Sequence, residues 1–111
     1  MASSGEESRP LYALNSDADD GDYTTPLVAA VSGKKIKVTL IIATVLTTAG
    51  VFSLKSGSTV IFAQHIALGV PLVVSAPDIG ICETAAGEAL VANNATGVDS
   101  YCHVGYVTVE P

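Results

Sequence analysis

The sequence predicts an all-β protein: a two-sheet antiparallel sandwich of about eight strands, similar to a jelly roll, with an extended N-terminal arm. Three observations lead to this expectation. β-Branched residues dominate the apolar runs, turn-forming Gly, Pro, Asn and Asp interrupt these runs at short intervals, and helix signals are nearly absent. Short strands at near-regular spacing are typical of a two-sheet sandwich.

The expected strands are the apolar runs that lie between turn residues. They are Leu27–Val31, Lys35–Thr47, Val51–Lys55, Thr59–Gln64, Leu72–Ser75, Ile79–Glu83, Ala89–Asn93 and Tyr101–Val109. The last of them is apolar on both faces, because Cys102 and Val104 alternate with Tyr101 and Val107. Such a strand suits a core on one face and a neighbouring subunit on the other.

The uncharged run between Lys37 and Lys55 leaves a membrane-spanning helix as an alternative. Its 17 residues would rise about 26 Å as a helix, at the short limit for a bilayer core of about 30 Å. Nine of the 17 are Val, Ile or Thr, which favour strands over helices. Two strands joined at Ala49-Gly50 are therefore expected instead.

Charge is scarce in this chain and unevenly distributed. Of the 111 residues, 14% are charged and 49% are hydrophobic, whereas about 25% are charged in an average soluble protein. We therefore expect part of the surface to be buried in contacts with other molecules. Residues 1–32 hold six carboxylates and one cation, and the remainder holds five carboxylates and four lysines. Five cations in total argue against a nucleic-acid-binding face.

Residues 1–26 are expected to form an acidic extended arm, and residues 27–111 the sandwich domain. The first 22 residues contain few large apolar side chains and could not build a core. No basic segment followed by an apolar one opens the chain, so no secretory signal is expected. The residues expected to bind a partner are the apolar cluster and the carboxylates of the arm: Leu11, Tyr12, Leu14, Asp17, Asp19, Asp20 and Asp22.

We expect no catalytic, cofactor-binding or metal-binding residues and therefore no enzyme. The segment from Asp17 to Asp22 lacks the glycine and closing glutamate spacing of an EF-hand calcium loop. Cys102 and His103 are adjacent, and adjacent residues of a strand point to opposite faces rather than to one zinc ion. No nucleophile with a base and no phosphate-binding glycine loop is recognised.

The two cysteines, Cys82 and Cys102, allow one disulfide. Buried thiols in a reducing compartment are an equally consistent interpretation. The sequence leaves both states open.

Three segments of the chain resemble a known group of proteins. The segments are Ser32–Val38, Leu54–Thr59 and above all Glu83–Leu90. They are similar to segments of short proteins from the structural gene clusters of tailed bacteriophages, and the resemblance extends over about Ser32–Val109. It implies a β-sandwich subunit similar to capsid decoration, or cement, proteins, which trimerise and cap junctions between capsomers. It assigns no site residue, and the acidic arm lies outside it.

The expected function is that of a structural virion protein on the exterior of a phage head, assembled in the host cytoplasm. Its expected partners are the major capsid protein and further copies of itself in a homotrimer, with no nucleic acid, membrane or cofactor. The alternative is a receptor- or glycan-binding β-sandwich module of a phage tail or head fibre. Such modules usually present exposed aromatic side chains, and this chain has 4 Tyr, 2 Phe and no Trp.

Overall fold

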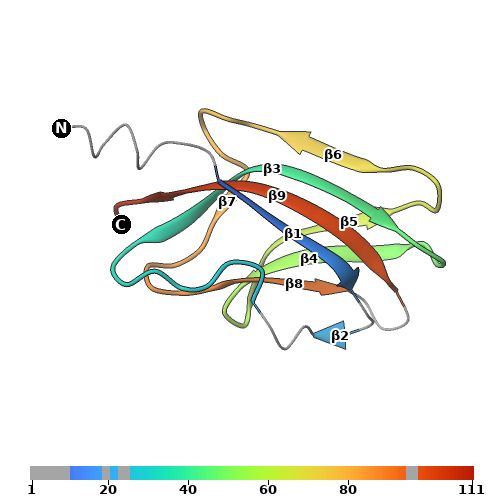
Figure 1. The fold of residues 1–111 in the computed structure, drawn as a ribbon, viewed down its shortest axis with the longest axis horizontal. Helices are drawn as coiled ribbons and strands as arrows, with labels where there is room; N and C mark the ends of the chain where they lie inside the picture. The colour runs from blue at the N-terminus through green and yellow to red at the C-terminus, as the bar shows by residue number, and fades with distance from the viewer. Residues whose placement is uncertain (1–10, 19–20, 23–25, 95–97) are drawn as a thin grey trace.

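The computed structural model describes residues 11–18, 21–22, 26–94 and 98–111. Within these residues, nine β-strands form two antiparallel sheets and no helix is present (Figure 1). The predicted all-β sandwich is therefore confirmed. The described residues contain no helix long and apolar enough to cross a lipid bilayer.

Each of the two sheets, A and B, has four strands that pair side by side, and sheet A has a short fifth strand beside one of them. The order in sheet A is β1 (Leu11–Ala18), β9 (Ser100–Val109), β3 (Lys35–Val45) and β6 (Leu72–Ser75), and β7 (Cys82–Glu83) also pairs with β3. The order in sheet B is β2 (Gly21–Asp22), β8 (Leu90–Asn94), β4 (Gly50–Ser56) and β5 (Thr59–Ile66).

This strand order is similar to that of a jelly roll. The chain changes sheet at most connections; β4 and β5 stay within sheet B as a hairpin, and β6 and β7 both lie in sheet A beside β3. Most consecutive strands are therefore stacked across the core rather than placed side by side, as two Greek keys require. The connections β3–β4 and β5–β6 lie together at one end of the sandwich, on the right of Figure 1.

Two predicted strands are much shorter in the structure. In Leu27–Val31, Val28 forms a single bridge with Leu90, and the chain then turns where the Lys34 amide donates to the Val31 carbonyl. The end of Ile79–Glu83 alone becomes β7, because the preceding residues form a tight turn in which Gly80 adopts a positive φ of 84°. Strong β propensity therefore did not suffice for a full strand where the chain turns.

A β-bulge in β3 determines which side chains of this long strand reach the core. Val38 lies opposite Tyr106, and Leu40 lies opposite Gly105, so Thr39 is the extra residue. Because of the bulge, both Val38 and Ile41 point into the sandwich although they are three positions apart. The bulge coincides with the point where the neighbour of β3 changes from β7 to β6.

The hydrophobic core lies between the sheets and is formed mainly by their central strands. Its fully buried members, at 0 or 1% exposure, are Ile36, Val38, Ile41 and Ala43 of β3, Phe52 and Leu54 of β4, Leu90 and Ala92 of β8, and Cys102 and Val104 of β9. The expectation that one face of the last strand contributes to a core is confirmed.

Candidate assembly surfaces

The outer face of sheet A exposes apolar side chains on three adjacent strands. Ile42 of β3 lies opposite both Val73 of β6 and His103 of β9, and Thr44 lies opposite Tyr101. Directly paired residues share one face of a sheet, and the core residues alternate with these, so the five side chains point away from the core. Ile42, Val73 and Tyr101 are 39%, 61% and 44% exposed. We call these five residues the apolar face.

A second exposed apolar group lies at one end of the sandwich. Leu46 follows β3, and Leu68 and Val70 lie in the connection between β5 and β6, at the right of Figure 1. Their exposures are 40%, 55% and 58%. We call these three residues the apolar tip. Neither the apolar face nor the apolar tip contains an Asp, Glu, Lys or Arg, which is unusual for surface permanently in contact with water.

The opposite end of the sandwich, where β3 begins, carries paired charges. The Lys34 ammonium lies 2.6 Å from the Glu110 carboxylate, and the Lys35 ammonium lies 3.8 Å from the Glu83 carboxylate. The Lys37 ammonium donates to the Asp78 carbonyl at 3.1 Å. Exposed ion pairs of this kind stabilise a fold little. We call this end, where β3 begins, the charged end; the apolar tip lies at the other end (Figure 1).

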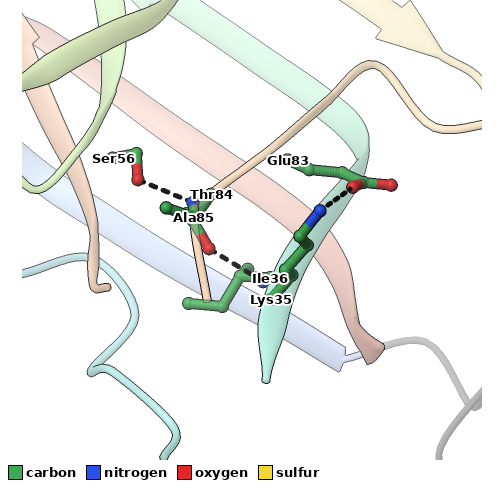
Figure 2. A network of polar contacts seen from close by, with 6 residues as sticks. All are labelled: Lys35, Ile36, Ser56, Glu83, Thr84 and Ala85. Carbon is green, nitrogen blue, oxygen red and sulfur yellow. Dashed lines mark hydrogen bonds and ion pairs between the residues drawn. The ribbon is translucent and has the colours of Figure 1, made fainter. Parts of the chain in front are cut away.

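A partly buried polar network attaches the segment Glu83–Leu90 to both sheets (Figure 2). The Ile36 amide donates to the Thr84 hydroxyl at 2.9 Å, and the Ala85 amide donates to the Ser56 hydroxyl at 2.9 Å. The Ser56 hydroxyl in turn donates to the Glu88 carboxylate at 2.5 Å. Each of these polar groups has a structural partner, so the arrangement fixes a loop over the end of the core.

Replacing Thr84 with valine tests this attachment. Valine has a similar shape but leaves the buried Ile36 amide without its side-chain acceptor, so the free energy of unfolding should fall by about 2 kcal/mol. Urea denaturation measures the change. The Thr84→Ser variant keeps the hydroxyl and should lose clearly less. Equal losses in the two variants would show that the hydroxyl is not the stabilising group.

The structure places part of the predicted partner-binding residues in strands. Leu11, Tyr12, Leu14 and Asp17 belong to β1, which pairs with β9 at the edge of sheet A. Asp22 belongs to β2, opposite Asn93 at the edge of sheet B. Asp19 and Asp20 lie outside the described residues. The boundary at residue 26 and the binding role of this segment stay predictions, but its two strands are hydrogen-bonded to the sandwich.

Of the two states that the sequence leaves open for Cys82 and Cys102, the structure has the free thiols rather than the disulfide. Cys82 lies opposite Val38 on one flank of β3, and Cys102 lies opposite Ala43 on the other flank. The four regular strand steps between these positions span about 13 Å, beyond the roughly 7 Å limit for a disulfide. Burial, and to a lesser extent the Glu83 carboxylate, raise the pKa of Cys82 to about 11, so this thiol is protonated at neutral pH.

Among the described residues, no group of three or more His, Cys, Asp or Glu side chains could hold a metal ion. Comparisons with protein-family models, with curated proteins and with solved structures found no match. The interpretation of this chain therefore depends on its own surfaces.

β9 is recognisable from the sequence as apolar on both faces, but the residues of the apolar face and the apolar tip are not. A signal for both was present, since the uncharged run between Lys37 and Lys55 contains Ile42, Thr44 and Leu46. This run contains more apolar side chains than the core between two sheets can bury. Some of them are therefore expected on the surface, in contact with another molecule.

Proposed function

We propose that this chain is a structural virion protein that decorates the exterior of a phage head. In this proposal its copies associate, as an expected homotrimer, and residues 1–26 contact the major capsid protein. The observation that supports it best is the apolar face, in which Ile42, Val73 and Tyr101 are exposed side by side on an uncharged sheet surface. Burial of such a surface between copies removes apolar area from water.

The end of the sandwich that holds the apolar tip is the part proposed to face the shell. β1 ends at Ala18 opposite Ser100, and β2 begins at Gly21 opposite Asn94, so Asp17 and Asp22 are both near this end along their strands. The apolar tip lies at the same end. Apolar contact there would supply affinity, while the carboxylates would meet basic residues of the capsid protein and favour the correct orientation.

The experiment combines purified protein with phage heads that lack this subunit. The wild-type chain is expected to have a solution mass of three copies, or a multiple of three, and to sediment with the heads. The double variant Asp17→Asn, Asp22→Asn should keep that mass but be retained at least tenfold less, because two carboxylates that attract basic capsid residues are gone. Substitution is preferable to deletion of residues 1–22, which would remove β1 and β2 from the sheets.

The matched control is the double variant Glu83→Gln, Glu110→Gln, which removes two carboxylates from the charged end. It should be retained like the wild type. Raising the salt concentration should release the wild type from the heads, so that its retained amount approaches that of the Asp17→Asn, Asp22→Asn variant. A monomer that does not sediment with heads would remove the proposal and favour a fibre module or another role.

A further inference from the structure

β5 is a long sheet edge with no described partner on its outer side. It is the last strand of sheet B, and in the described part of the chain it pairs with β4 alone. Three consecutive residues, Ala63, Gln64 and His65, are all exposed, which shows that both faces of the strand are accessible there. Its outer backbone amides and carbonyls therefore form a template for another strand.

β5 lacks several of the features that normally protect an edge strand, and the one that it has is a β-bulge at Ile61. Edges are usually short, charged, bent by a β-bulge, or interrupted by proline. The eight residues Thr59–Ile66 contain no Asp, Glu, Lys, Arg or Pro. By contrast, β6 has four residues and lies between Pro71 and Pro77, whereas β1 and β2 carry Asp17 and Asp22. Among the four sheet edges, β5 is the one that is both long and free of charge.

We propose that β5 pairs antiparallel with β5 of a second copy across a two-fold axis, which joins the two B sheets into one continuous sheet. A second copy fits because antiparallel self-pairing places identical strands against each other, and this strand brings no like charges together. With the axis at Gln64, for example, in the regular part of the strand beyond the Ile61 bulge, Gln64 faces itself and Phe62 faces Ile66. Apolar and aromatic side chains across strands are the favourable case.

The geometry of an antiparallel ladder makes this pairing specific enough to test. Hydrogen-bonded and non-hydrogen-bonded pairs alternate along the ladder. A two-fold axis maps each residue pair of the ladder onto a pair of the same kind. The axis therefore has to pass between two copies of one residue, which face each other across the ladder. The Cα atoms of that pair lie about 4.5–5.5 Å apart, within the range of about 4.4–6.8 Å that a disulfide needs.

The experiment places single cysteines at each of the five positions from Val60 to Gln64, in a Cys82→Ser background. Cys102 is buried at 1% exposure and stays in place. Under mild oxidation, one of the five variants should form a covalent dimer at least tenfold faster than its neighbours. Ala86→Cys, at an exposed position in the loop at the charged end, is the control and should not show this rate.

A second pair of variants tests the same contact without cross-linking. Ala63→Lys adds like charges on both sides of the two-fold axis and should halve the solution mass, whereas Ala86→Lys should leave the mass unchanged. Absence of a fast cross-link at all five positions, or an unchanged mass with Ala63→Lys, would overturn the proposal. A β5 cysteine that cross-links only to a different protein, and not to a second copy of this chain, would also overturn the proposal.

This inference does not depend on the proposed function, because the apolar face belongs to sheet A and β5 is the edge of sheet B. If both contacts form, the assembly contains an even number of copies, and the Ala63→Lys variant reveals the smaller unit. Loss of binding to phage heads with an intact β5 cross-link would remove the decoration role alone.

Discussion

Replacing Phe52 with alanine is expected to lower the free energy of unfolding by about 3–5 kcal/mol, the usual cost of removing a buried aromatic side chain. Phe52 is 0% exposed and is the largest fully buried side chain among the described residues. It enters the core from β4, a central strand of sheet B, and faces β3 and β9 of sheet A. Because small domains are stable by only about 5–15 kcal/mol, this loss is a large part of the total stability.

Urea denaturation of the Phe52→Ala variant measures this loss, at several protein concentrations because self-association adds to apparent stability. The control is Ile79→Ala, which removes an apolar side chain that is 83% exposed and should change the stability by about 0.5 kcal/mol or less. A loss below about 1 kcal/mol at Phe52 would mean that the two sheets do not pack against each other through this residue.

The fold could be predicted where local signals and partner strands agree. β6 has the bounds expected from the sequence, Leu72–Ser75, because β-branched residues there lie between two prolines. The uncharged run after Lys37 was correctly divided into two strands at a small-residue turn. In both cases the residues that interrupt a strand lie close to its ends, so the bounds depend little on distant parts of the chain.

β1 and β2 could not be predicted, because their extended conformation comes from their partners. Asn15, Ser16 and Asp17 disfavour a strand by composition. β9 nevertheless presents an edge to which residues 11–18 pair, and the backbone hydrogen bonds are independent of side-chain type. The polar composition that suggested an arm is the usual composition of an edge strand next to water.

The apolar face could not be located from the sequence, because the β-bulge changes the alternation within β3. If β3 had no bulge at Thr39, the alternation that starts with Ile36 and Val38 in the core would place Ile42 in the core and Ile41 outside. The structure has the reverse, with Ile41 at 0% and Ile42 at 39% exposure. Which side chains of an apolar run reach the surface depends on a backbone irregularity that no local motif marked.

The second large effect is expected at Gly50, the first residue of β4. A Cβ atom added at this position would lie 2.4 Å from Val98 Cγ2, which is closer than two carbon atoms can approach without repulsion. Val98 is 3% exposed and packed in the core, and its branched side chain has few alternative rotamers. Gly50→Ala should therefore lower the free energy of unfolding by about 3 kcal/mol, the upper part of the usual range for overpacking.

The double variant Gly50→Ala, Val98→Ala distinguishes this close approach from a general preference for glycine in a turn. Val98→Ala alone leaves a small cavity and destabilises the core. When both changes are combined, the methyl group added by the Gly50→Ala substitution occupies part of the space that Val98 vacates. The double variant should therefore be more stable than the sum of the single losses predicts, by about 1–2 kcal/mol. Additive losses, within about 0.5 kcal/mol, would show that Gly50 and Val98 do not touch.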